Sequence, residues 1–133
     1  MRLSAFFVWS VLVIGGAAVM FGQPSSRQVI GGNPNLPFSA AVKAGGFVYV
    51  SGTIGAGPNV TGDIRKQTKD TLDSIAATLK SAGSSMANAA SVTVYLRYAS
   101  DFATMNEVYA TYFPKNPPAR TTVVLTQPLA LPE

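Results

Sequence analysis

Residues 116–125 read Asn-Pro-Pro-Ala-Arg-Thr-Thr-Val-Val-Leu, and they carry the most informative local signal in the chain. Proline fixes φ and biases the residue before it toward extended backbone, so Pro117 and Pro118 stiffen the chain just ahead of Arg120. The β-branched run that follows is typical of a strand, which is clearest at residues 123–125. We therefore expect Arg120 to be held in a fixed direction at the mouth of a strand. A guanidinium held in this way can bind a carboxylate through two parallel hydrogen bonds.

Upstream of this strand, the sequence predicts a β-hairpin. Residues 40–44 lead into Gly45-Gly46, which is a tight-turn signal, and the aromatic and β-branched residues 47–51 follow. Residues 24–36 are rich in Pro, Gly, Ser and Asn, and we expect a linker there with room for a short strand at residues 28–30.

A first amphipathic helix is expected between Asp63 and Ala82, because apolar residues recur there at helical spacing. Thr61 or Gly62 can open this helix and Gly83 can end it. The expected apolar stripe consists of Ile64, Thr68, Leu72, Ile75, Ala76, Leu79 and Ala82.

A strand and a second helix are expected next. Residues 90–98 alternate between apolar and polar side chains, as a strand with two different faces does. Ser100-Asp101 can cap a helix that Pro114 ends. Its apolar stripe, expected to belong to the core, is formed by Phe102, Met105, Val108, Tyr109, Tyr112 and Phe113. The order of elements predicts an α+β fold, with an antiparallel or mixed sheet and two helices on one face.

Composition narrows the chemistry that one chain can perform. The 133 residues, enough for one domain, include no cysteine and no histidine. Zinc sites, thiol nucleophiles, serine–histidine relays and disulfides are therefore excluded within one chain. An enzyme built from this sequence must use arginine, amides, hydroxyls, an acidic residue or a group from a neighbouring subunit. The acidic residues are Asp63, Asp70, Asp73, Asp101, Glu107 and Glu133.

The formal charge of +4 does not indicate a nucleic-acid partner. Basic residues are dispersed, and the short cluster of Arg65, Lys66 and Lys69 is interrupted by Asp63 and Asp70. We interpret this cluster as a solvated helix face rather than a nucleic-acid footprint.

The N-terminus has the pattern of a secretory signal, which we place at residues 1–23. Met1-Arg2 is followed by the uncharged, mostly apolar residues 3–21 and then by small and polar residues. We expect export to the periplasm or the outside. The alternative is a retained membrane anchor, because the apolar stretch is nearly long enough to span a bilayer. Residues 59–61 form a glycosylation sequon to which we give little weight.

Several short motifs occur together in an order that resembles one family. They are Pro37-Phe38-Ser39, Tyr49-Val50-Ser51-Gly52, Gln67-Thr68 with Leu72, Asp101-Phe102 with Asn106-Glu107-Val108-Tyr109, and Pro118-Ala119-Arg120. In this order and spacing the chain resembles the RidA (YjgF) family, also called the reactive-intermediate deaminase or L-PSP endoribonuclease family. The resemblance covers about residues 28–133, and we place the RidA-like domain at residues 37–133.

The resemblance implies a fold, an assembly and an activity. The fold is the α+β fold of the chorismate-mutase type (bacillus type), and the assembly is a homotrimer with active sites between subunits. The activity is hydrolysis of reactive enamines and imines, of the 2-aminoacrylate and 2-iminopropanoate type, to a 2-keto acid and ammonia, without cofactor or metal. Arg120 would bind the substrate carboxylate as the catalytic residue. The other residues implied for substrate binding are Phe38, Ser51, Gly52, Asn106 and Thr122.

This chemistry is consistent with the composition. An imine hydrolyses readily once it is protonated, so positioning the substrate and one water, together with charge stabilisation, can suffice. No activated nucleophile is required. A chain without histidine and cysteine can therefore perform this hydrolysis.

The sequence departs from the family pattern in three places. Phe38 stands where the family usually has a tyrosine, so that side chain can wall a pocket but cannot form a hydrogen bond. Ser39-Ala40-Ala41 lacks the usual glutamine. Residues 129–133 end before the family's final Val-Glu-Ile-Glu-like strand, whose acid is thought to help activate water, and Glu133 is not its equivalent. We expect a fragment of a longer reading frame, with unpaired strand groups, weak stability and little deaminase activity.

Alternatives stay open for both the function and the residues. The second functional hypothesis is a module that binds small carboxylates without efficient turnover, and the third, ribonuclease or translation-inhibitor activity, has little support. Arg120 could instead form a surface or interface ion pair, and Asn106 a helix-surface or interface hydrogen bond. Ser51 could be a strand-end residue bonded to a neighbour, and Thr122 an ordinary strand residue.

Overall fold

The computed structural model describes residues 26–55 and 63–127. The predicted leader, the glycosylation sequon and residues 128–133 lie outside these described residues. Among the described residues, no helix is both long enough and apolar enough to cross a membrane.

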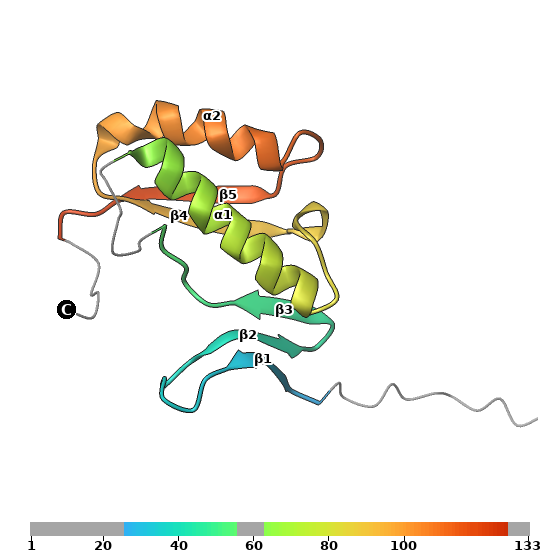
Figure 1. Ribbon diagram of the computed structural model, residues 1–133. Coiled ribbons are helices and arrows are strands. Elements are labelled where there is room, and N and C mark those ends of the chain that lie inside the picture. Colours follow the sequence, from blue (N-terminus) through green and yellow to red (C-terminus); the bar gives the residue numbers. More distant parts are fainter. Residues whose placement is uncertain (1–25, 56–62, 128–133) are drawn as a thin grey trace, which may run out of the picture.

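The first sheet is antiparallel, with strands in the order β1-β2-β3 (Figure 1). Its members are β1 (Gln28–Gly32), β2 (Ser39–Ala44) and β3 (Phe47–Val50). Gly45 and Gly46 join β2 to β3 with φ values of 56° and 81°, and such left-handed backbone at both positions of a two-residue turn favours glycine. The predicted hairpin is therefore confirmed. The short strand expected within residues 24–36 is also present, as the edge strand β1.

Helix α1 spans Ile64–Ser81. One face of this helix forms the predicted apolar stripe. Its N-cap is Asp63, whose side chain accepts a hydrogen bond from the Arg65 N–H at 2.9 Å. The expectation that Thr61 or Gly62 opens the helix is therefore wrong, because the Asp63 carboxylate already satisfies a free amide of the first turn. At the other end the Gly83 and Ser84 amides donate back into the last turn, which is a Schellman motif.

The second half of the chain forms a parallel β–α–β unit. Strands β4 (Ser91–Leu96) and β5 (Ala119–Val124) pair in parallel, and helix α2 (Phe102–Tyr112) connects them. Short 3₁₀ helices, η1 (Met86–Asn88) and η2 (Ala99–Asp101), precede β4 and α2. The last strand thus begins at Ala119, four residues before its predicted start, so that Arg120 lies inside it.

The predicted side-chain cap of the second helix is wrong. Asp101 precedes α2, but its side chain forms no capping hydrogen bond. Its backbone continues from η2 in helical conformation, with φ −78° and ψ −12°. A capping side chain normally needs the extended backbone that this turn does not provide.

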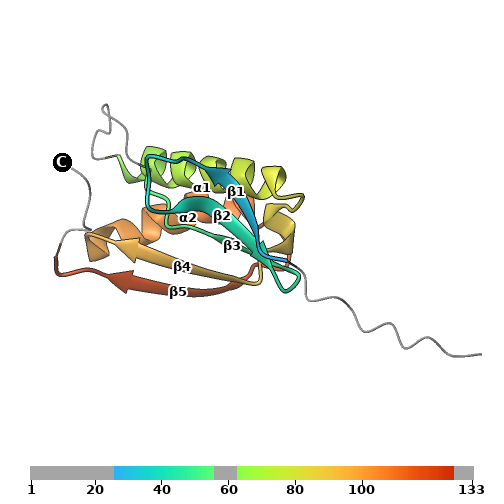
Figure 2. The same cartoon turned by 90° about the horizontal axis from the view of Figure 1, so that it is seen from below.

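The described strands form two sheets, β1-β2-β3 and β4-β5, rather than one mixed sheet. In the described part of the chain, β3 and β4 therefore each keep one unpaired edge. Both helices lie on one side of the strands, as predicted, and Figure 2 shows α1 along the upper side of the molecule and β4 and β5 along the lower side.

The core lies between the two helices and the second sheet. Its buried members come from α1, β4, α2 and the residue after α2, namely Leu72, Leu96, Met105, Tyr109 and Phe113. Met105 is 2% exposed. The predicted stripe of α2 is confirmed for Met105, Tyr109 and Phe113, whereas Phe102 is exposed.

The face of the strands that points away from the helices is uncovered and apolar. Strand alternation and register place Val29 and Tyr49 on this face of the first sheet and Tyr95 and Val123 on that of the second. Phe47 and Tyr49 are 62% and 61% exposed. We call these five residues the open sheet face. Exposed apolar patches of this kind mark interaction sites on soluble proteins.

Candidate functional site

Arg120 is oriented by the segment before it and by helix α2. Asn116 has a φ of 49°, a left-handed conformation that asparagine tolerates, and Pro117-Pro118 then lead the backbone into β5. The guanidinium carbon lies 4.6 Å from the centre of the Tyr109 ring and 5.8 Å from that of Phe102. These are cation–π distances, so aromatic rings hold the arginine in place.

No carboxylate in the described part of the chain lies within ion-pair distance of Arg120. The predicted alternative of an ion pair is therefore not realised within these residues. A guanidinium is always charged and presents a planar fork of donors. Arg120 thus keeps donors available for an anionic ligand.

A cavity of about 480 Å³ opens beside Arg120. Helix α2, the proline pair and β5 form its walls, with the lining residues Asn106, Tyr109, Ala110, Phe113, Pro117, Pro118 and Arg120. The proline pair therefore does more than stiffen the chain, because both rings also wall the cavity. We call this space the Arg120 cavity.

Three buried polar atoms in the same layer have no hydrogen-bond partner among the described residues. They are Asn106 Oδ1, Tyr109 Oη and Thr122 Oγ1. Thr122 lies two residues after Arg120 on the same side of β5. Leaving a buried acceptor or hydroxyl unpaired costs about 1–3 kcal/mol. Asn106 and Tyr109 line the cavity together with Arg120, so their unpaired atoms indicate a ligand, a water or another chain as partner.

Burial raises the pKa of Tyr109, and the positive charge of Arg120 opposes this shift. The phenol is therefore protonated at neutral pH. It can donate one hydrogen bond and accept another.

The remaining predicted site residues flank strands of the first sheet, with Phe38 just before β2 and Ser51 and Gly52 just after β3. A second cavity, of about 660 Å³, opens there. Phe38 and Ser51 line this cavity, and Phe38 is 58% exposed. The Ser51 hydroxyl donates to the Ser39 carbonyl at 2.6 Å, which is the strand-end role considered as its alternative. Gly52 follows Ser51 but lines neither of the two cavities.

The predicted site residues therefore fall into two groups within one chain. Arg120 and Asn106 line the Arg120 cavity, and Thr122 lies on the same side of β5 as Arg120 without lining that cavity, whereas Phe38 and Ser51 lie at the other cavity. Tyr109 is the residue that sequence reasoning missed, because its place in an apolar helical stripe indicated the core. Its position three residues after Asn106, on the same helix face, was the signal that could have found it.

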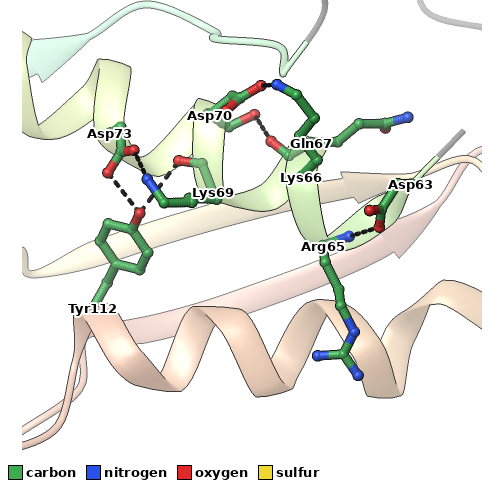
Figure 3. Close-up of polar contacts among 9 residues, drawn as sticks. Asp63, Arg65, Lys66, Gln67, Lys69, Asp70, Asp73 and Tyr112 are labelled. Carbon is green, nitrogen blue, oxygen red and sulfur yellow. Dashed lines mark hydrogen bonds and ion pairs between the residues drawn. The ribbon is translucent and has the colours of Figure 1, made fainter. Parts of the chain in front are cut away.

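The basic cluster on α1 is neutralised by acidic neighbours, as the interpretation of a solvated helix face predicts. Ion pairs join Lys66 to Asp70 and Lys69 to Asp73 (Figure 3), and Arg65 to Glu107 across to α2. Within the described ranges, no three potential metal-ligating residues gather into a group that could hold an ion. The absence of metal and cofactor stays a prediction.

The chain belongs to the endoribonuclease L-PSP family, whose profile matches residues 32–128; this is the RidA (YjgF) family of the sequence resemblance. Its relatives include a RutC family protein of Pyrococcus horikoshii, 45% identical over 98 residues that cover 71% of this chain and 78% of the relative. Another is the human 2-iminobutanoate/2-iminopropanoate deaminase, 39% identical over 88 residues, or 63% and 64% of the two chains.

Solved structures agree with this assignment. Yeast Mmf1 superposes with a TM-score of 0.72 at 29% identity, over 79% of this chain and 90% of that chain. A putative endoribonuclease of Thermotoga maritima superposes with a TM-score of 0.69 at 31% identity, over 77% and 87%. The fold is therefore the predicted α+β fold of the chorismate-mutase type.

Proposed function

We propose that this protein hydrolyses reactive enamines and imines of small amino acids, of the 2-aminoacrylate and 2-iminopropanoate type, to 2-keto acids and ammonia. The observation that carries the proposal is Arg120, held by the Tyr109 ring beside a cavity and without a carboxylate partner among the described residues. The printed name of the human relative describes a deaminase of such imines. The reaction class is hydrolysis of a carbon–nitrogen bond.

Arg120 would grip the substrate carboxylate with two N–H donors and so fix the adjacent C2 atom inside the cavity. Water adds to C2 of the protonated imine, a proton moves to nitrogen, and the C2–N bond breaks to release ammonia and leave a C2 carbonyl. Asn106 Oδ1, which is buried and unpaired, can accept a hydrogen bond from the iminium N–H. These interactions would stabilise the positive charge on nitrogen.

The complete site would be shared between copies of the chain. Phe38 and Ser51 lie at a cavity separate from that of Arg120, and the open sheet face is apolar and uncovered. Docking this face against other copies would bury it and could bring the two groups of residues together. We propose a homotrimer, and the molar mass from analytical ultracentrifugation or light scattering tests it.

The decisive experiment compares Arg120→Ala with wild type in an assay that follows keto-acid release from freshly generated 2-aminoacrylate. We expect wild type to accelerate release and the variant to lose at least about 100-fold, because a charged, oriented hydrogen-bond pair contributes about 3 kcal/mol or more. Arg97→Ala is the matched control, since Arg97 is an exposed arginine just after β4 whose guanidinium interacts with the neighbouring Tyr98 and does not line the Arg120 cavity.

Equal rates for wild type and Arg120→Ala would refute the proposed role of Arg120. A second candidate, a carboxylate-binding module without efficient turnover, is favoured by two observations. The Ser51 hydroxyl is engaged by Ser39, and no carboxylate of the described residues lines the Arg120 cavity to activate water. Arg120-dependent binding of 2-oxobutanoate without accelerated imine hydrolysis would identify that function.

We further propose that residues 1–23 direct export of the protein. The support is their sequence pattern, in which a basic start precedes a long apolar run. N-terminal sequencing of the protein from fractionated cells tests this. A mature start near Gln23 in the exported fraction is expected, and an intact N-terminus in the membrane fraction would indicate the anchor instead.

A further inference from the structure

The hydroxyl of Tyr109 is the feature of the Arg120 cavity that the proposed mechanism does not use. Tyr109 is 6% exposed, and its ring packs against both the Arg120 guanidinium and the Phe113 ring, with a centroid distance of 4.6 Å to the latter. The ring is therefore fully engaged in packing. Its oxygen, in contrast, has no hydrogen-bond partner among the described residues.

Packing alone does not explain a tyrosine at this position. Phenylalanine would supply the same ring to Arg120 and to the core without a buried hydroxyl that lacks a partner, and Phe113, four residues later, is such a phenylalanine of the core. An unpaired buried hydroxyl lowers stability. A ligand in the Arg120 cavity, which Tyr109 lines, can supply the partner that this hydroxyl lacks.

We propose that Tyr109 contacts the substrate and recognises the group on C2 of the acid whose carboxylate binds Arg120. This inference rests on the proposed function. Because Arg120 stacks on the ring of Tyr109, the guanidinium and the phenol belong to one rigid unit. In a 2-keto or 2-imino acid the carboxylate and the C2 heteroatom are likewise neighbours. The hydroxyl donates to a keto oxygen or imine nitrogen, or accepts from an iminium N–H.

The consequence is specificity for 2-keto and 2-imino acids over simple carboxylic acids. A site that contains a buried polar group discriminates against ligands that leave this group unpaired. Butanoate has the same chain length and carboxylate as 2-oxobutanoate but has no heteroatom on C2. The pair therefore isolates the contribution of the Tyr109 hydroxyl.

The test measures binding of 2-oxobutanoate and butanoate to the full chain by isothermal titration calorimetry, for wild type and Tyr109→Phe. We expect wild type to bind 2-oxobutanoate more tightly than butanoate. In Tyr109→Phe the ratio of these two affinities should fall about tenfold, because one hydrogen bond in a site without water is lost. Butanoate binding should be unchanged, and Tm should be equal or higher because an unpaired hydroxyl is removed. Tyr98→Phe, at an exposed tyrosine, should bind both acids as wild type does.

The outcomes separate this inference from the proposed function. If wild type prefers 2-oxobutanoate and Tyr109→Phe keeps the full preference, the inference fails while the carboxylate site stands. A lower Tm with equally weakened binding of both acids would show a merely structural role and would also overturn it. If wild type binds neither acid, the carboxylate site of the proposed function fails, and the role of Tyr109 fails with it.

Discussion

At the scale of single residues, Arg120 shows how local and non-local causes combine. The direction of its backbone comes from the adjacent prolines, which sequence alone could reveal. The position of its guanidinium depends on Tyr109 and Phe102, which the chain brings to it through the crossover from α2 to β5. A residue can therefore be singled out from its neighbours in sequence, while its partners become known only when the elements are packed.

Gly55 is a second single residue whose identity is constrained, because its backbone lies close to helix α1. A Cβ built on Gly55 would lie 2.1 Å from the backbone oxygen of Gln67 in α1, and no real contact is that short. We expect Gly55→Ala to lower the free energy of unfolding by about 1–3 kcal/mol, because backbone atoms must move apart. Urea unfolding monitored by circular dichroism measures this loss.

Gly52→Ala is the control for that substitution. A Cβ on Gly52 would meet no heavy atom within 4 Å, so its stability should stay within about 0.5 kcal/mol of wild type. An equal loss in both variants would show that the close approach of Gly55 to α1 is not what limits substitution there.

At the scale of elements, the signals that predicted correctly were local ones. The Gly45-Gly46 turn and the helical spacing of apolar residues depend on neighbours within a few positions, and both were confirmed. The error at the start of α1 concerned a choice between adjacent candidates, because Thr61, Gly62 and Asp63 can all cap a helix. The sequence left open whether the sheet is antiparallel or mixed. The parallel pairing of β4 with β5, and the division of the described strands into two sheets, depend on contacts between residues far apart in the sequence.

The contact between α1 and α2 provides a prediction about pH. The Tyr112 hydroxyl donates to Asp73 Oδ1 at 2.6 Å, and Lys69 also donates to Asp73 (Figure 3). These hydrogen bonds, that of Lys69 first, lower the pKa of Asp73 from its ordinary 3.8. Burial and Asp73 raise the pKa of Tyr112 above its ordinary 10.0, and the hydrogen bond to Asp73 raises that of Lys69.

The directions of these pKa shifts decide the pH range in which the contact stabilises the fold. Asp73 contributes stability above its unfolded pKa and loses it as pH falls through the lower folded value. Tyr112 and Lys69 contribute below their unfolded values and lose this as pH rises through the higher folded values. We therefore expect urea midpoints to be highest between about pH 5 and 9.

Tyr112→Phe tests this assignment, because it removes the hydroxyl and keeps the ring. It should lower the urea midpoint at pH 7, and its difference from wild type should shrink at pH 3 and at pH 11. A difference that is constant across this range would mean that the hydroxyl contributes nothing through Asp73.

At the scale of the whole molecule, the two sheets leave strand edges that can be examined directly. The Ser51 N–H donates to the Ala40 carbonyl at 3.0 Å, and hydrogen-bonded pairs alternate along an antiparallel ladder. The register then directs the amides of Phe47 and Tyr49 toward β2 and those of Val48 and Val50 toward the unpaired edge. Amide hydrogen exchange followed by NMR should be distinctly faster for Val48 and Val50 than for the other two residues.

Equally slow exchange at all four amides would contradict an unpaired edge. It would show that backbone outside the described residues, or another chain, pairs with β3. The comparison needs no variant, because the two inward amides serve as internal controls for the two outward ones.

The open sheet face has a consequence for reaction order. If the active site needs residues from more than one copy of the chain, the number of complete sites depends on association of the copies. The concentration of the associated form rises with a power of the protein concentration that is greater than one. The rate would then rise faster than in proportion to the amount of protein, until association saturates. Below saturation, halving the amount of such a protein would remove more than half of its capacity to hydrolyse imines. The exposed aromatic residues Phe47, Tyr49 and Tyr95 do not line the Arg120 cavity, yet through association they would set this dependence on protein concentration.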